Sequence, residues 1–210
     1  MNIPFIIICV ILVLLINFGR KYLIKDTLSK LTDYLYNGNF GDFEKLINAW
    51  YVKYLINPFN IDFLKLNKAL ISNNDKEIEK SLSAFENVKM TDIQARNVYQ
   101  KAFFYYLKNE NTKKLKKYYS LISNLEDKTL LNEIDDIYKI VVENNIDLLD
   151  RYLDRYETNN NDSMAVYLLY HIYNNKGDKK NYNKYLRIFN GLVEKGSIIW
   201  WERWTIEMMK

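Results

Sequence analysis

The side chains that most often do chemistry in proteins are few and scattered in this sequence. His171 is the only histidine, and the only cysteine, Cys9, lies in an apolar N-terminal run. Asp135 and Asp136 are neighbours, so on a helix their side chains diverge by about 100° and cannot meet at one substrate. The sequence also contains no glycine-rich phosphate loop and no Cys-x-x-Cys or His-x-x-x-His pattern. It therefore predicts no enzyme, no cofactor and no metal site.

One basic cluster stands out from an otherwise mixed charge pattern. It comprises Lys113, Lys114, Lys116 and Lys117, which surround apolar positions of one predicted helix. Such a cluster is either a solvated helix face or a patch that anionic lipids attract. The net charge is only +4, and basic and acidic residues alternate along the chain. These charges do not indicate a nucleic-acid partner.

The composition predicts an ordered, all-α protein. Apolar residues make up 49% of the chain and charged residues 27%, which excludes a disordered tail. There are only 6 glycines and 2 prolines, too few for the many tight turns of an all-β fold. Heavy use of Asn, Lys, Ile and Tyr is typical of an AT-rich, bacterial genome.

The segment from Ile3 to Phe18 is almost wholly apolar and predicts a membrane anchor within residues 1–25. Sixteen helical residues span about 24 Å, and the chain up to Ile24 can complete a hydrocarbon core of about 30 Å. A cleaved signal peptide is the alternative, and it would make the protein a secreted one. That alternative needs an N-terminal basic region and a small-residue cleavage site, and the sequence has neither.

The charges that flank this segment predict its orientation. Four basic residues follow it and none precedes it: Arg20, Lys21, Lys25 and Lys30. The positive-inside rule then places the protein in the cell membrane as a single-pass chain, with residues 26–210 in the cytoplasm.

Residues 26–210 carry a repeated pattern of turns and amphipathic helices. The turns contain Asn or Gly and lie at 37–39, 73–75, 109–111, 144–145 and 176–178. Each is followed by apolar residues spaced four and then three apart: Phe43/Ile47/Trp50, Ile78/Leu82/Phe85, Leu115/Tyr119/Ile122, Leu149/Leu153/Tyr156 and Tyr182/Leu186/Phe189. The first members of these sets lie about 33–37 residues apart, which is the period of a helical-hairpin repeat.

This pattern resembles the tetratricopeptide repeat family, most clearly from Val166 through the turn at Gly177 to Phe189. The resemblance implies an α-solenoid of about five helical hairpins. The family's small residues at the helix contacts are replaced here by bulky ones such as Phe103 and Tyr170, so we expect a degenerate array. Residues 197–204, with Trp200, Trp201 and Trp204, predict a C-terminal capping helix. Alternatively, the tryptophans form a docking site or a second contact with the membrane interface.

The resemblance also implies a binding groove, lined by the first helices of successive repeats. Its outward positions would be Gln100, Phe104, Asp135, Lys139, Tyr167, His171 and Asn175. A mixture of aromatic and polar side chains suits a peptide ligand. We therefore expect a membrane-tethered module that binds a protein or peptide partner. A self-associating scaffold at the membrane is the alternative.

Overall fold

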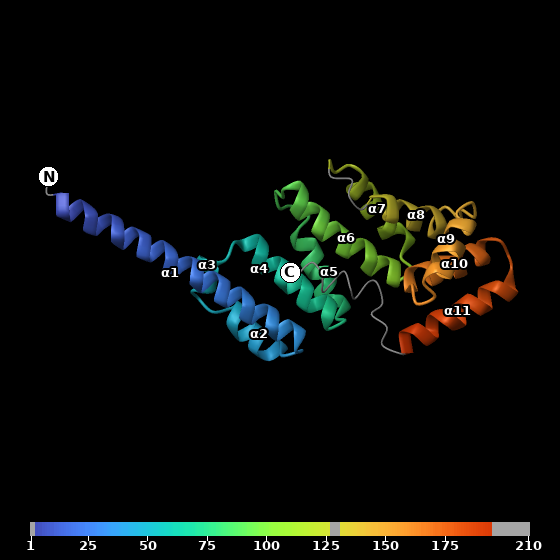
Figure 1. Ribbon diagram of the computed structural model, residues 1–210, viewed down its shortest axis with the longest axis horizontal. Helices are drawn as coiled ribbons and strands as arrows, with labels where there is room; N and C mark the ends of the chain where they lie inside the picture. Colours follow the sequence, from blue (N-terminus) through green and yellow to red (C-terminus); the bar gives the residue numbers. More distant parts are fainter. Residues whose placement is uncertain (1–2, 127–130, 195–210) are drawn as a thin grey trace. The chain divides into compact units, whose positions relative to one another are not determined.

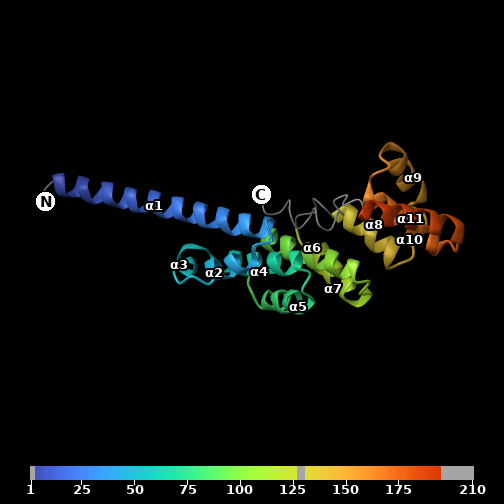
Figure 2. The ribbon, with the colours of Figure 1, turned by 90° about the horizontal axis from the view of Figure 1, so that it is seen from below.

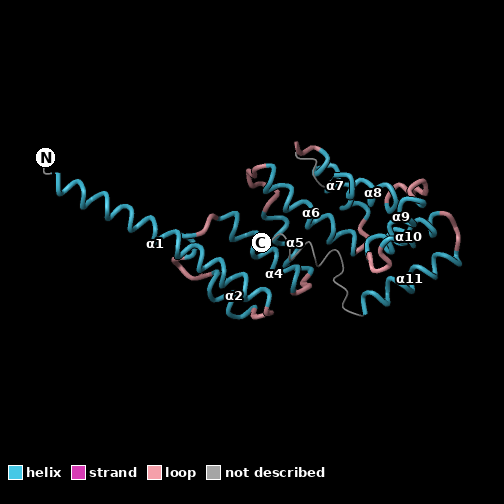
Figure 3. The backbone as a smooth tube through the Cα atoms, viewed as in Figure 1, coloured by secondary structure: helices cyan, strands magenta, loops and turns pink. Residues whose placement is uncertain are grey.

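The computed structural model describes the backbone of residues 3–126 and 131–194, and the side chains within these ranges from residue 11 onward. Within these ranges every regular element is a helix, so the predicted all-α class is confirmed and the eleven helices are compatible with a helical-repeat fold (Figure 3). Among the described residues, no helix has both the length and the apolar character that crossing a bilayer requires. The chain divides into two compact units, residues 1–86 and 87–210.

The first unit is built on a long N-terminal helix (Figure 1). Its helices are α1 (Ile3–Tyr36), α2 (Phe40–Ile47), α3 (Val52–Leu55), α4 (Pro58–Ile71) and α5 (Asp75–Ala84). Helix α1 packs against α2, α3 and α4, and α4 packs against α5. Only the C-terminal half of α1 belongs to this core, where Thr27, Leu31 and Leu35 are buried. The predicted boundary at residue 25 therefore falls inside one continuous helix.

The second unit is centred on α10. Its helices are α6 (Asp92–Lys108), α7 (Thr112–Ser123), α8 (Leu131–Val141), α9 (Leu149–Thr158), α10 (Ser163–Asn175) and α11 (Lys179–Glu194). Helix α7 packs against α6 and α8, while α10 packs against α8, α9 and α11. Because neighbours contact α10 on several sides, every residue from Met164 to Leu169 is buried.

The five predicted turns all join helices, and each contains one residue in the left-handed backbone region. These residues are Gly38, Asn73, Glu110, Asn144 and Gly177, at φ between 50° and 72°. They lie 33–37 residues apart, so the period seen in the sequence is also a period of backbone conformation. A left-handed residue after the last helical turn lets the helix end abruptly and reverse direction.

Four of these turns share the same hydrogen bonds. In the α10–α11 turn, the N–H of Gly177 donates to Asn174 O at 3.0 Å and the N–H of Asp178 donates to Tyr173 O at 3.0 Å. The turns at Gly38, Asn73 and Glu110 repeat this pair. The residue after the left-handed position, which is Asn or Asp, is the cap of the next helix in all four. The sequence pattern thus encodes one repeated way of ending a helix and starting the next.

The fourth turn differs. Here the N–H of Asn145 donates to Lys139 O, six residues back, and Leu148 precedes α9 without a side-chain cap. The side chain of Asn145 instead accepts a hydrogen bond from the N–H of Asp147. The longer connection changes which residues of α9 are buried. Tyr152 is buried, whereas Leu149, Leu153 and Tyr156, the predicted apolar set, are only half-buried.

The predicted core is otherwise largely found, with one clear error at Trp50. Phe43 and Ile47 are buried as expected, but Trp50 is 76% exposed. The reason is that α2 ends at Ile47, so Trp50 lies in the bend before α3 and not on the face of α2. The predicted C-terminal capping helix with Trp200, Trp201 and Trp204 lies outside the described residues.

Candidate functional site

The seven predicted groove residues all lie on α6, α8 and α10, but they differ in accessibility. Gln100 and Phe104 on α6 and Tyr167 on α10 are buried, at 1%, 3% and 5% exposure. Asp135, His171 and Asn175 are half-buried, and Lys139 is exposed. The three buried residues therefore contribute to packing, and the accessible polar positions come from α8 and the C-terminal half of α10.

Asp135 and Lys139 form one polar cluster on α8. Lys139 Nζ lies 2.6 Å from Asp135 Oδ2, and the hydroxyl of Tyr119 on α7 donates to Asp135 Oδ1 at 2.6 Å. Burial opposes the charge of Asp135, but the hydrogen bonds from Lys139 and Tyr119 outweigh it and lower the pKa of this carboxyl. The ring of Tyr119 stacks on Tyr138 with centroids 3.8 Å apart. This cluster ties α7 to α8 and leaves a charged pair facing solvent.

Tyr167 and His171 belong to an aromatic cluster on α10. The His171 ring lies 4.6 Å from the Tyr167 ring and 4.4 Å from the Tyr170 ring, centroid to centroid. Burial lowers the pKa of His171 to about 4, so the imidazole is neutral at neutral pH. Near the end of the same helix, Asn175 Nδ2 donates to Ile140 O of α8 at 2.8 Å. Aromatic contacts thus hold Tyr167 and His171 in place, and a hydrogen bond to α8 holds Asn175.

Two of these residues carry buried polar atoms without a partner. Neither the amide oxygen nor the amide nitrogen of Gln100 forms a hydrogen bond with any described residue, and the same holds for His171 Nε2. Leaving such an atom unpaired costs about 1–3 kcal/mol. These atoms are closed to solvent, so they are a cost to the packing of α6 and α10.

A network that the sequence analysis did not predict joins α8 to α9. The hydroxyl of buried Tyr152 donates to Asp136 Oδ2 at 2.9 Å, and Arg151 Nη1 lies 2.7 Å from the same oxygen. Burial, followed by the charge of Asp136, raises the pKa of Tyr152. Although Asp135 and Asp136 diverge as predicted, both have structural roles, one toward α7 and one toward α9. The sequence feature that could have indicated this network is Asp136, a charged residue at a position that faces the apolar core.

Lys101 on α6 is a second unexpected residue. Its side chain is only 4% exposed, and burial lowers its pKa to about 7. A lysine with a pKa near neutrality can act as a nucleophile or base, but catalysis also needs a second reactive group beside it. The helical spacing at 101 gave no indication of burial.

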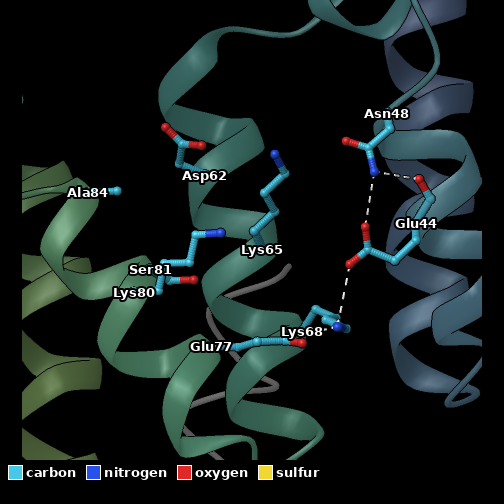
Figure 4. A pocket seen from close by; sticks show the side chains of 9 residues that line it. All are labelled: Glu44, Asn48, Asp62, Lys65, Lys68, Glu77, Lys80, Ser81 and Ala84. Carbon is cyan, nitrogen blue, oxygen red and sulfur yellow. Dashed lines mark hydrogen bonds and ion pairs between the residues drawn. The ribbon is translucent and has the colours of Figure 1, made fainter.

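The first unit contains a charged pocket between α2, α4 and α5 (Figure 4). Its volume is about 360 Å³, and its charged lining consists of three lysines and three carboxylates: Glu44, Asp62, Lys65, Lys68, Glu77 and Lys80. Lys68 Nζ lies 2.7 Å from Glu77 and 3.4 Å from Glu44, and the hydrogen bond to Glu77 raises the pKa of Lys68. The charges offset one another, so the pocket selects neither an anion nor a cation. The ion pairs of Lys68 connect α4 to α2 and to α5.

The described residues contain no group of three His, Cys, Asp or Glu side chains that could hold a metal ion. The comparisons with known proteins are equally without a result, because no protein-family model, no curated protein and no solved structure matches the chain.

Proposed function

We propose that the protein is a membrane-tethered helical-repeat module that holds a protein or peptide partner near the bilayer. The observation that carries the proposal is the contrast between the two halves of α1. Its C-terminal half is core, with Leu31 and Leu35 buried, while its large apolar side chains from Ile11 to Leu23 are 50–71% exposed. Apolar surface of this extent is costly in water and indicates a site of interaction.

A bilayer is the cover that best suits this half of α1. Upstream of Ile11 the sequence stays apolar to Ile3, and the helix is continuous from Ile3 onward. At about 0.3–0.6 kcal/mol for each Leu, Ile, Val or Phe, transfer into hydrocarbon is favourable by several kcal/mol. The first basic residues, Arg20 and Lys21, follow the apolar run. They favour the orientation in which residues 26–210 lie in the cytoplasm.

The repeat geometry supports the binding part of the proposal. Recurrent left-handed turns at a period of 33–37 residues agree with a tetratricopeptide-like array of five hairpins. Such arrays use an extended surface to bind peptides and proteins. The proposed partner surface includes Lys139, His171 and Asn175, the predicted groove residues that are at least partly accessible on α8 and α10.

The tether is tested by floating the full-length chain with lipid vesicles. The proposal predicts that the chain rises with the vesicles and stays with them at high salt, since an apolar helix is not released by screening. A chain that remains at the bottom of the gradient contradicts the proposal.

Partner binding is tested in the native host with a photo-crosslinking amino acid at Lys139, and with Lys180 as an exposed control on α11. A partner crosslinked from position 139 and not from 180 supports the groove. Identical products from both positions contradict it.

A self-associating scaffold is the second candidate, because another copy of the chain could also cover the exposed half of α1. Light scattering of the chain in detergent distinguishes the two. A single mass that matches one chain excludes the scaffold, whereas a defined oligomer favours it.

A further inference from the structure

The bend between α2 and α3 carries an exposed aromatic cluster in the first unit. Trp50 is 76% exposed and Tyr54 is 78% exposed, and the ring of Trp50 lies 6.1 Å from Tyr51 and 6.3 Å from Tyr54. Large aromatic side chains this open to solvent are rare in the absence of a partner. We call Trp50, Tyr51 and Tyr54 the aromatic corner.

The aromatic corner lies where α1 leaves the packed part of its unit. Helix α2 runs back along the C-terminal half of α1, and α3 packs against α1 near its middle (Figure 2). The pKa of Lys30 on α1 is raised mainly by Asp26, and the charge of Tyr51 in the corner makes the smallest contribution. From Lys30 to Leu23, which ends the exposed apolar run that begins at Ile11, the rise along the helix is about 10 Å.

Several exposed basic residues lie on α1 and on α3, the helix that follows Tyr51. Arg20, Lys21 and Lys25 on α1 and Lys53 on α3 are exposed, and none forms an ion pair within the described ranges. Asp26, the first acidic residue of the chain, pairs with Lys30 at 2.7 Å. The surface beside the exposed half of α1 therefore combines aromatic rings with free positive charge.

We propose that the aromatic corner is a second membrane contact, which lies in the headgroup layer of an anionic bilayer when α1 is inserted. This inference rests on the proposed tether. Trp and Tyr favour the interface because their rings are apolar and their N–H and O–H groups stay hydrated. A headgroup layer about 5–7 Å thick, added to the reach of a Trp side chain, covers most of the rise of about 10 Å from Leu23 to Lys30, and α3 packs against α1. The free cations gain about 1 kcal/mol each near anionic lipid.

Such a contact would fix how the first unit is oriented against the bilayer. A single helix leaves its domain free to rotate and tilt, whereas a second contact to one side of the helix restricts both motions. The surface of α2, α4 and α5 would then present the same face to the cytoplasm in every molecule.

The test uses the fluorescence of Trp50 in the full-length chain. Trp200, Trp201 and Trp204 are replaced by phenylalanine, so that Trp50 is the only tryptophan. The protein is added to vesicles that contain anionic lipid and phosphatidylcholine brominated near the headgroup end of its acyl chains. A matched control moves the single tryptophan to the far end of α1, as Trp50→Phe with Tyr36→Trp. Position 36 lies about 20 Å beyond Leu23 along the helix.

The expected result is that Trp50 emission shifts to the blue and is strongly quenched by brominated lipid, while the Tyr36→Trp control is not quenched. Lys53→Gln should weaken the quenching on anionic vesicles. A chain that floats with vesicles but whose Trp50 is quenched no more than the control overturns this inference and leaves the tether intact. A chain that does not float overturns the tether and this inference together. A blue shift that depends on protein concentration and occurs without lipid identifies a second copy as the occupant and also overturns it.

Discussion

Replacing Ile11 by lysine is the sharpest perturbation of the proposed tether. Ile11 lies at the centre of the apolar run from Ile3 to Phe18, and its side chain is 50% exposed, so the first unit does not need it for packing. At the centre of a membrane helix an isoleucine contributes about −0.3 to −0.6 kcal/mol and a lysine costs about 2.5–3.5 kcal/mol. The change of about 3–4 kcal/mol corresponds to a loss of vesicle partitioning of roughly 10²- to 10³-fold.

Vesicle flotation over a range of lipid concentrations measures this loss. Tyr22→Lys is the matched control, because it adds the same charge at the end of the run, where a lysine reaches the headgroups. Both variants should keep the wild-type circular dichroism spectrum, since lysine is a good helix former and both sites are exposed. If Ile11→Lys floats as well as Tyr22→Lys, the N-terminal half of α1 does not enter hydrocarbon and the reasoning is refuted.

Three further predictions concern the fold, and denaturant unfolding measures each. Glu110→Gly should raise the free energy of unfolding and Gly177→Ala should lower it, each by about 1 kcal/mol or less, because both positions have left-handed backbone. If both substitutions changed the free energy of unfolding in the same direction, the shared turn geometry would be contradicted. Phe43→Ala should cost about 3–5 kcal/mol and Trp50→Ala less than about 0.5 kcal/mol, since only the first is buried; similar losses would show that Trp50 is part of the core. The pKa of His171 is lowered in the folded chain to about 4, so the unfolded chain takes up a proton first as the pH falls below 6.5, and stability is lost between pH 6.5 and 4. His171→Phe should remove about 2 kcal/mol of the loss between pH 7 and 5, and an unchanged pH dependence would show that the imidazole is solvated.

The turns are the part of the fold that the sequence predicted best. Gly38 and Gly177 mark left-handed positions directly, and Asn73 and Asn144 tolerate the same conformation. Glu110 has no such preference, yet the flanking Asn109 and Asn111 identified its turn. A local signal was sufficient because the conformation of these turns is set by a few consecutive residues.

Two errors arise where the apolar spacing does not show where a helix ends or how long the preceding turn is. Trp50 fits the apolar spacing of α2, but the helix ends before it, and the spacing alone does not show where the helix stops. In α9 the longer fourth turn places Tyr152 in the core ahead of the predicted leucines.

The errors in the predicted groove have a different cause, which is packing between helices. A residue that points away from its own helix's apolar set can still be covered by another helix. Gln100 and Phe104 face away from that set and are nevertheless buried, whereas Lys139 is exposed. The sequence pattern predicted helices, but it did not predict the distances between them, which the bulky side chains of this chain determine.

Alkylation of Cys9 tests the tether most directly, because Cys9 is the only cysteine and lies within the apolar run. A water-soluble maleimide reacts with the thiolate, which does not form in hydrocarbon. The proposed tether predicts that Cys9 of the full-length chain reacts at least about tenfold more slowly in lipid vesicles than in urea without lipid, as expected for a thiol with no access to water. Equal rates in the two conditions would place Cys9 in water and contradict the account.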